Sequence, residues 1–335
     1  MNFQSDNAAG TRPDILAAVV AANVATTEAY DADAWSQRLD AAYSDLFSTA
    51  CTVLPVSTGT AANALALAAM VPPYGAIVCH HDAHINVDEC GAPEFFTGGA
   101  KLLLCQGVDG KLSPESVTAG TAAHRGGVHQ VQLAALSLTQ ATECGTVYTP
   151  DEVKALATLA KSRGWRVHMD GARFANAVAG LGCHPADVTW RAGVDILSLG
   201  VIKNGGMTAE ALVIFDESLA EPIRFRRKRA GQLPSKGRYQ ATQLLAYIEQ
   251  DQWLATASSA NVGARQIARV AGPRLAYPTQ ANEIFVHLTP TEAAELRAAG
   301  FAFYDWGSPE DHLARFVVAW DTPPEAIAAV VMALS

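Results

Sequence analysis

The sequence predicts an α/β fold in which a large domain with a mostly parallel seven-stranded sheet precedes a smaller α/β domain. Half of the 335 residues are hydrophobic, so the chain can bury a sizeable core and is too long for one small domain. Over roughly the first two-thirds of the chain, short apolar runs alternate with longer helical patterns. This alternation is typical of a parallel sheet covered on both faces.

Seven short apolar runs are the candidate strands of the sheet. They are Thr52–Val56, Ala76–Cys79, Lys101–Cys105, Leu133–Leu138, Trp165–Met169, Asp195–Leu199 and Ala211–Phe215. The segment Asp151–Arg163 is amphipathic and follows Thr149-Pro150, a cap and a first-turn proline, so we expect a helix there. The segment Ala61–Met70 is rich in alanine and leucine, which indicates a buried helix.

The pattern changes after Phe215. A long helical region is expected from about Ser235 to Ala271, including Ala241–Glu249 and Trp253–Ala268. Further strands are expected at Glu283–Leu288, Phe301–Tyr304 and Arg315–Trp320, with helices at Thr291–Ala299 and Pro324–Leu334. We therefore predict a large domain over residues 1–240, and a long helix with a small domain over residues 241–335.

Composition narrows the classes of function. The chain has 33 acidic and 24 basic residues and a net charge of −9, which argues against nucleic-acid binding. Its six cysteines are scattered without a C-x-x-C pair, which is typical of free thiols in a reducing compartment. The first residues lack the basic start and apolar run of a signal peptide, and no apolar stretch approaches the ~20 residues of a membrane span. We expect a soluble, cytoplasmic protein.

Four segments place polar residues at the ends of predicted strands, where open parallel sheets bind their ligands. The first, Ser57–Asn63, is a turn of small and hydroxylated residues at which a helix starts. Free N–H groups and the helix dipole favour a phosphate there, and Gly59 allows close approach to the backbone. A turn that only caps the helix is the simpler alternative.

The second and third segments carry ionisable side chains. Asp170 follows a strand and lies three residues before Arg173. Asp-Gly is also an ordinary turn, but a carboxylate in this position can keep a pyridinium nitrogen protonated. Lys203 follows an apolar strand and lies among glycines, where lysine is rare. Desolvation would make its amine nucleophilic enough for Schiff-base chemistry, and a structural lysine is the alternative.

The fourth segment runs from His80 to His84 and contains three histidines and an aspartate. A metal site is one interpretation, because imidazole and carboxylate ligands are close in sequence. However, His80 and His81 are adjacent at a strand end and should point apart, and no recognised ligand spacing is present. We therefore expect a functional His84 beside two solvated histidines, and no metal.

Taken in order, these segments resemble the low-specificity L-threonine aldolases, a family of fold-type-I enzymes that use pyridoxal 5′-phosphate (PLP). The motifs that carry the resemblance are Ser5-Asp6-Asn7, Ser57–Asn63, His84, Asp170–Arg173 and Ser198-x-Gly-x-x-Lys203-Asn-Gly205. Two further segments, Leu136–Glu143 and Arg226–Lys236, are similar to the proteobacterial branch. The resemblance therefore extends over nearly the whole chain.

The resemblance implies a role for each motif residue. Lys203 would bind PLP covalently, Asp170 would bind the ring nitrogen, and His84 would stack on the ring. Thr58, Gly59 and Thr60 would hold the phosphate. Ser5, Arg173 and Arg315 would grip the substrate carboxylate, since a guanidinium suits bidentate pairing. Tyr30 would lie near the substrate, and His129 falls where the family carries a second active-site histidine.

The resemblance also implies a homodimer or homotetramer with active sites at subunit boundaries, where Lys228 and Lys236 could reach a neighbour's phosphate. The basic run Arg224–Arg229 can equally be a solvated helix face. Two segments depart from the family pattern. Ile202 stands where a hydroxyl residue is usual, and Glu28–Asp31 replaces a more glycine-rich segment.

The predicted function is aldol cleavage of a β-hydroxy-α-amino acid, such as L-threonine or L-allo-threonine, to glycine and an aldehyde. His84 or His129 would take the proton of the β-hydroxyl. Alternatives on the same scaffold are a phenylserine-type aldolase, transamination and β-elimination. Alternatives of another class are a metal-dependent hydrolase using His80, His81 and His84, and a non-catalytic binding protein.

Overall fold

A computed structural model describes residues 1–335, and its main feature is a seven-stranded sheet with the order β1-β7-β6-β5-β4-β2-β3. The strands are β1 (Thr52–Val56), β2 (Gly75–His80), β3 (Lys101–Cys105), β4 (Gln132–Thr139), β5 (Arg166–Gly171), β6 (Ile196–Leu199) and β7 (Glu210–Ile214). Strand β7 is antiparallel to both of its neighbours, and the other pairs are parallel. The predicted mostly parallel sheet is confirmed, and each predicted strand overlaps the observed one.

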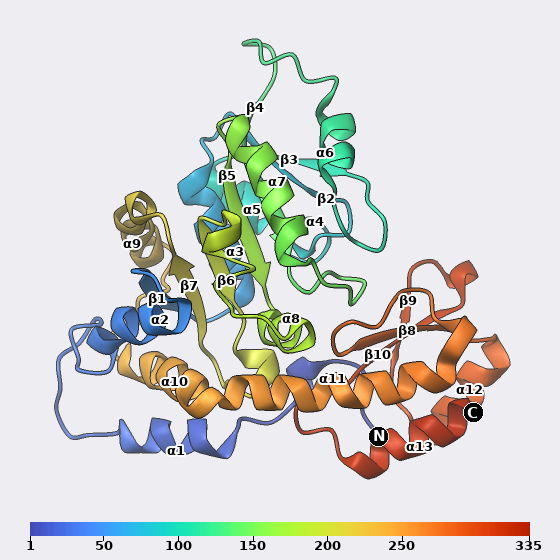
Figure 1. The fold of residues 1–335 in the computed structure, drawn as a ribbon. Helices are drawn as coiled ribbons and strands as arrows, with labels where there is room; N and C mark the ends of the chain where they lie inside the picture. Colours follow the sequence, from blue (N-terminus) through green and yellow to red (C-terminus); the bar gives the residue numbers. More distant parts are fainter.

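Helices cover both faces of this sheet (Figure 1). The α-helices of the whole chain are α1 (Pro13–Ala21), α2 (Leu39–Phe47), α3 (Gly59–Met70), α4 (His84–Val87), α5 (Ala92–Thr97), α6 (Pro114–Thr121), α7 (Pro150–Ser162), α8 (Phe174–Leu181), α9 (Ala220–Arg229), α10 (Arg238–Ile248), α11 (Gln252–Ala271), α12 (Pro290–Ala298) and α13 (Pro324–Leu334). Helices α3 and α9 pack on one face, and α2, α6, α7, α8 and α10 pack on the other. Neighbouring strand residues such as Val53 and Leu54 belong to opposite cores, because side chains alternate along a strand.

Helix α7 begins as its sequence predicts. The Thr149 hydroxyl accepts a hydrogen bond from the Glu152 backbone N–H, and the Glu152 carboxylate accepts one from the Thr149 N–H. This reciprocal capping box satisfies two donors that have no partner within the helix. Pro150 occupies the first helical position, where a missing N–H costs nothing.

The helical region predicted from Ser235 to Ala271 is divided into two helices. Helix α10 ends at Ile248 and α11 begins at Gln252. Between them, Gln250 and Asp251 have φ angles of 54° and 56°, in the left-handed region that a right-handed helix cannot include. The turn directs α10 onto the large sheet and leads α11 from the first core into a second one.

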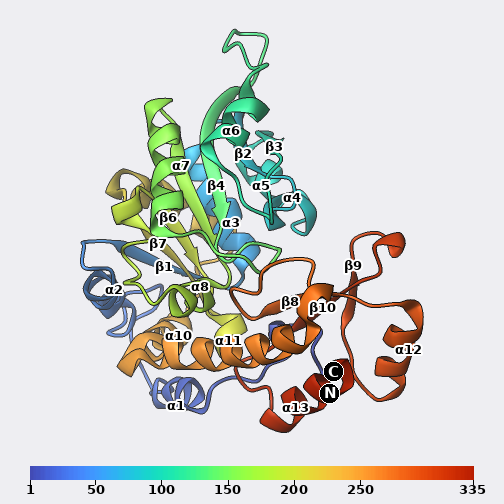
Figure 2. The ribbon, with the colours of Figure 1, turned by 45° about the vertical axis from the view of Figure 1, so that its right-hand side comes forward.

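The second core surrounds a three-stranded antiparallel sheet with the order β8-β10-β9 (Figure 2). Its strands are β8 (Glu283–His287), β9 (Tyr304–Trp306) and β10 (Leu313–Val317). The predicted strand Phe301–Tyr304 is wrong except at its last residue. Phe301 and Phe303 are buried, but Ala302 between them pairs with the N-terminal segment, where Phe3 N–H donates to its carbonyl at 2.8 Å. The apolar alternation there therefore reflects burial and not membership of the sheet.

Phe3 and residues of α11, α12 and α13 share this second core, and both chain termini lie beside it (Figures 1 and 2). The N-terminal segment thus crosses from the small sheet to the large one. The domain boundary at residue 240 stays a prediction. None of the helices combines the length and the hydrophobicity that crossing a membrane would require.

Candidate active site

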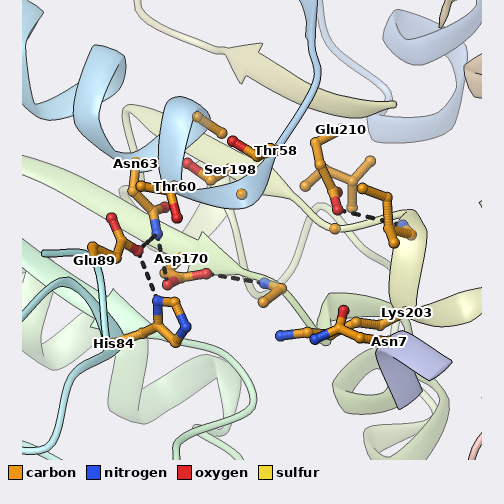
Figure 3. A pocket seen from close by; sticks show the side chains of 16 residues that line it. Asn7, Thr58, Thr60, Asn63, His84, Glu89, Asp170, Ser198, Lys203 and Glu210 are labelled. Carbon is orange, nitrogen blue, oxygen red and sulfur yellow. Dashed lines mark hydrogen bonds and ion pairs between the residues drawn. The ribbon is translucent and has the colours of Figure 1, made fainter. Parts of the chain in front are cut away.

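A cavity of about 270 Å³ lies at the carboxyl ends of β5 and β6, beside the start of α3 (Figure 3). Its wall includes Thr58, Gly59, Thr60, His84, Asp170 and Lys203. These six residues come from four separate segments of the sequence and were all predicted to lie in one site. The site forms because the parallel strands end at the same edge of the sheet.

The start of α3 forms one end of the cavity. The Thr58 hydroxyl accepts a hydrogen bond from the Ala61 N–H at 3.1 Å, so this turn does cap the helix. The next two N–H groups, of Gly59 and Thr60, precede the first intrahelical donor and have no partner within the helix. No atom lies within 4 Å of the place where a Cβ on Gly59 would stand. The segment therefore caps the helix and also leaves space for an anion at its N-terminus.

Asp170 is fixed at the end of β5 with 3% of its surface exposed. Its Oδ2 atom accepts a hydrogen bond from Nδ2 of Asn63 at 2.9 Å, and Oδ1 accepts from the Ala172 N–H at 3.0 Å. A carboxylate held by two donors has little freedom to turn. It can therefore present a fixed negative charge to a ligand in the cavity.

His84 is the first residue of α4, and its Nδ1 atom lies 2.8 Å from Oε1 of Glu89. This hydrogen bond raises the pKa of His84 against the opposing effect of burial. Burial in turn raises the pKa of Glu89, which also accepts a hydrogen bond from Nδ2 of Asn63 at 2.7 Å. Asn63 thus connects Glu89 and Asp170, and the three side chains set the orientation of the imidazole ring (Figure 3).

Lys203 lies in a short 3₁₀-helix, η4 (Ile202–Asn204), after β6. The carboxylate of Glu210 holds the preceding turn, because it accepts a hydrogen bond from the Val201 N–H at 2.6 Å. Burial raises the pKa of Glu210 to about 7. Gly200 is required in the same turn, since a Cβ there would stand 2.2 Å from the carbonyl oxygen of Ala172. The lysine is therefore presented by a tightly packed turn.

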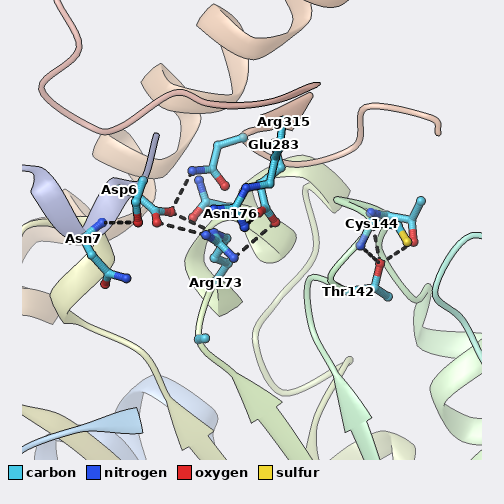
Figure 4. Close-up of polar contacts among 12 residues, drawn as sticks. Asp6, Asn7, Thr142, Cys144, Arg173, Asn176, Glu283 and Arg315 are labelled. Atoms are coloured by element: carbon cyan, nitrogen blue, oxygen red, sulfur yellow. Dashed lines mark hydrogen bonds and ion pairs between the residues drawn. The ribbon is translucent and has the colours of Figure 1, made fainter. Parts of the chain in front are cut away.

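Arg173 is buried next to the cavity, with 7% of its side chain exposed, and it is already paired (Figure 4). Its Nε and Nη2 atoms donate to the two carboxylate oxygens of Asp6 at 2.8 and 3.0 Å. Asn282 donates to the same carboxylate at 3.0 Å. Burial opposes ionisation of Asp6, but the charges of Arg173 and Lys203 and these hydrogen bonds outweigh it and hold the pKa of Asp6 below its ordinary value.

Arg315 lies on β10 of the small sheet. Its guanidinium and that of Arg173 lie near the same carboxylate, that of Glu283. Nη1 of Arg173 lies 3.2 Å from one oxygen of Glu283, and Nη1 of Arg315 lies 3.7 Å from the other. Nη2 of Arg315 donates to the Gln4 carbonyl at 3.2 Å. Ser5, which was predicted with these arginines, caps the 3₁₀-helix η1 (Asp6–Ala8) by accepting a hydrogen bond from the Asn7 N–H at 3.1 Å.

The model of the family described as beta-eliminating lyase matches residues 2–290. The chain belongs to this family. It is 44% identical to the low specificity L-threonine aldolase of Pseudomonas aeruginosa, over 97% of this chain and 94% of that protein. It is 42% identical to the enzyme of the same description from a Pseudomonas species, over 96% and 93% of the two chains. The solved structure of a Leishmania major threonine aldolase superimposes with a TM-score of 0.93 at 26% identity, covering 99% of this chain and 98% of that one.

Membership of the beta-eliminating lyase family makes the chain a PLP-dependent lyase of fold type I. The residues of the cavity fit this cofactor. The turn at Gly59 has open space and free N–H groups for a phosphate, Asp170 offers a fixed carboxylate, and Lys203 lines the same cavity. These three features are the ones that PLP chemistry requires of a protein.

Seven residues to which the family resemblance gave roles do not line this cavity: Ser5, Arg173 and Arg315, described above, and His129, Tyr30, Lys228 and Lys236. His129 is exposed on the loop before β4, at the amino end of that strand, and does not line its own chain's cavity at the carboxyl ends of β5 and β6. Tyr30, Lys228 and Lys236 are exposed as well, and Nζ of Lys228 lies 4.6 Å from the centre of the Tyr30 ring. The basic run on α9 is mostly the solvated face that its sequence allowed, except that Arg227 is buried.

The prediction that His80 and His81 point apart is wrong, and so is the prediction that His80 is solvated, whereas His81 is partly exposed. Their rings lie 4.4 Å apart, and His80 is buried. Both ring nitrogens of His80 are occupied, because Nδ1 accepts from the Asp82 N–H at 3.2 Å and Nε2 lies 3.3 Å from the Gly107 carbonyl. His84 is bonded to Glu89 instead of joining them, so the arrangement does not favour a three-histidine metal site.

Several buried partners of the site were not predicted from the sequence. Asn63 is only the last residue of the predicted Ser57–Asn63 turn, and Glu89 lies outside the four predicted segments. Glu210 and Glu283 lie in apolar strands, where a single carboxylate among hydrophobic residues is the signal that could have identified them.

Proposed function

We propose that the protein cleaves β-hydroxy-α-amino acids, with L-threonine and L-allo-threonine as substrates, to glycine and acetaldehyde. The observation that carries this proposal is the presence of Lys203, Asp170 and His84 around one cavity in a member of the beta-eliminating lyase family. The two Pseudomonas relatives that share more than 40% of their residues with the chain bear the description of low specificity L-threonine aldolase.

Within this proposal, Lys203 holds the cofactor covalently, and Thr58, Gly59 and Thr60 bind its phosphate at the N-terminus of α3. Asp170 binds the ring nitrogen, and His84 stacks on the ring. When bound, PLP supplies a conjugated ring that accepts the electron pair released from the Cα–Cβ bond. Ile202 offers no hydroxyl to the phosphate, so the backbone donors of α3 carry more of that contact.

Ser5, Arg173 and Arg315 bind the substrate carboxylate in the proposed mechanism. By fixing the carboxylate, they orient the Cα–Cβ bond for cleavage, and a bond held in the reactive geometry loses much of its entropic barrier. The proton of the β-hydroxyl leaves as the aldehyde C=O bond forms. His84 is the candidate base within the chain, and the raised pKa that Glu89 gives it means that it accepts this proton more readily once it is neutral.

His129 can act on a substrate only in the cavity of another subunit. We therefore propose a homodimer or homotetramer in which His129, Lys228, Lys236 and Tyr30 extend toward a neighbouring site. Their exposure supports this proposal, since each side chain lies on the surface where a neighbouring subunit could meet it. A cytoplasmic location is proposed with it, supported by six free cysteines.

The test of the proposed function is the absorbance spectrum of the purified protein, before and after adding L-threonine, with aldehyde measured in the same samples. Wild type and the surface control Lys154→Ala should absorb above ~400 nm and release aldehyde, because PLP bound to a lysine is a conjugated chromophore. Lys203→Ala should lose both properties. A flat spectrum with added PLP would contradict the cofactor assignment, and activity that requires a keto acid or disappears with a chelator would point to transamination or hydrolysis.

A mixing experiment tests the shared sites. Lys203→Ala and His129→Ala subunits are dissociated together and reassembled. If His129 acts in a neighbour's site, the mixed oligomers regain part of the wild-type activity, because one kind of site then has both residues intact. Mixtures no more active than the separate variants would contradict action between subunits.

A further inference from the structure

Glu283 occupies an unusual position for an acid. It begins β8, only 1% of its surface is exposed, and neither carboxylate oxygen receives a hydrogen bond. Its two nearest charges are Nη1 of Arg173 at 3.2 Å and Nη1 of Arg315 at 3.7 Å (Figure 4). A buried carboxylate without hydrogen-bond donors is costly, so this arrangement calls for a reason beyond stability.

The two arginines differ in which of their N–H donors already have an acceptor. Arg173 uses Nε and Nη2 on Asp6, which satisfies both partners. Arg315 keeps a buried Nε with no acceptor, and its guanidinium lies over the Trp306 ring at 4.4 Å. The region around Glu283 therefore contains an unused donor, two unused acceptor oxygens and two cations.

The charges around Glu283 limit the binding of a carboxylate to this cluster. Arg173 and Arg315 carry two positive charges, and ionised Asp6 and Glu283 carry two negative charges, so the cluster as a whole is neutral. Lys203 and Glu143 are the other charged groups that face it. A substrate carboxylate entering this cluster would meet Glu283 as a like charge in a buried site, where repulsion is weakly screened.

We propose that Glu283 controls binding of the substrate carboxylate: it balances Arg173 and Arg315 in the free enzyme and takes up a proton when an amino acid binds between them. This inference rests on the proposed function, because it assigns the two arginines to the substrate carboxylate. The protonated acid is a hydrogen-bond donor, and the incoming carboxylate is the acceptor that the cluster lacks. Burial raises the pKa of Glu283 against the effect of both arginines, which favours uptake of this proton.

The sign of the pH dependence follows from linkage. If the carboxylate binds only to the protonated form of Glu283, binding is strongest below the pKa of Glu283 in the free enzyme. Above that pKa, the Kd rises by up to about tenfold for each pH unit, because one proton must be taken up per ligand bound. In Glu283→Gln no such proton is needed, so this rise disappears.

The experiment measures ligand binding by the holoenzyme from pH 5.5 to 9, by absorbance at equilibrium. The proteins are wild type, Glu283→Gln and Glu295→Gln, which removes an exposed acid from the same small domain. The ligands are glycine and methylamine, which shares the amine but has no carboxylate. We expect the ratio of glycine Kd values, wild type over Glu283→Gln, to rise with pH by up to about tenfold per unit, while the methylamine ratio stays constant. Glu295→Gln should match wild type with both ligands.

A ratio of glycine Kd values, wild type over Glu283→Gln, that stays constant across this pH range would overturn the inference. A second measurement does not depend on how the variant folds: calorimetry of the wild type in buffers of different ionisation enthalpy counts the protons taken up. Glycine should bind with up to one more proton taken up than methylamine, and equal numbers would also overturn it. If neither amine perturbs the cofactor spectrum, the proposed function itself is wrong, whereas binding of both with one pH dependence rejects only the role of Glu283.

Discussion

Replacing Asp6 with asparagine should destabilise the protein by about 3 kcal/mol, which tests whether the buried pair with Arg173 holds the N-terminal segment in place. The substitution keeps the shape of the side chain but removes the charge that two guanidinium N–H groups contact at 2.8 and 3.0 Å. Removing one partner of a buried ion pair costs roughly 3–5 kcal/mol, because the other charge is left in a poorly solvated site. Glu283, at 3.2 Å from Arg173, compensates in part, so the lower end of the range applies.

Urea unfolding followed by circular dichroism measures the effect, at one protein concentration and without added cofactor, since both change apparent stability. Asp305→Asn is the matched control, because Asp305 pairs with Arg297 at 2.7 Å with 76% of its side chain exposed. Exposed pairs contribute at most about 1 kcal/mol. The unfolding slope should stay constant while the midpoint falls for Asp6→Asn.

The same pair predicts a dependence on pH. The pKa of Asp6 is lowered in the folded protein, so its contribution is fully present above the unfolded value of about 3.9 and is lost as the pH falls through the lower folded value. The difference in stability between wild type and Asp6→Asn should therefore be constant near neutral pH and shrink below about pH 4. If Asp6→Asn and Asp305→Asn cost the same at pH 7, the pair does not anchor the segment.

Two further substitutions test the chemistry of the cavity. Glu89→Gln should lower the pKa of His84, because the hydrogen bond that His84 donates to Glu89 is the main cause that raises it; a histidine titration followed by NMR measures the change, and an unchanged value would contradict the assigned pairing. Asp170→Asn removes the charge beside the cofactor and keeps one acceptor oxygen, which can accept from Asn63 or from the Ala172 N–H but not from both, so turnover should fall by roughly 10²–10³-fold with an unchanged circular dichroism spectrum, and near-normal turnover would exclude an electrostatic role.

The parts of this fold that follow from local patterns were predictable. Strands β1 and β3 have the predicted bounds, because each is a continuous apolar run between turn residues. Thr149 caps α7 as expected, since capping depends on neighbouring residues alone. Lys203, Asp170 and His84 meet because parallel strands end at one edge of a sheet, so topology converts separate motifs into one cavity.

Features that depend on contacts between residues far apart in the sequence could not be predicted from local patterns. Asp6 and Arg173 are 167 positions apart, so nothing near either residue indicates the pair. Helix α10 ends where the chain turns so that α11 can reach the second core. Neither Gln250 nor Asp251 is a residue type that by itself ends a helix. For the same reason Phe301–Tyr304 was predicted as a strand of the sheet, although Phe301 packs beside the N-terminal segment.

Three cations of the site, Arg173, Arg315 and His84, each lie next to a carboxylate, which explains why so many acids are buried around the site. Arg173 is paired with Asp6 from the N-terminal segment, Arg315 faces Glu283 of the small sheet, and His84 is bonded to Glu89. Each pairing joins chain segments that the backbone alone would leave free to shift. Buried ion pairs contribute little net stability, but they fix geometry, and fixed charges are what stabilise charge that develops in a reaction. We infer that these acids serve to position the cations, so neutralising Asp6 or Glu89 should impair binding or turnover more than its cost in stability would suggest.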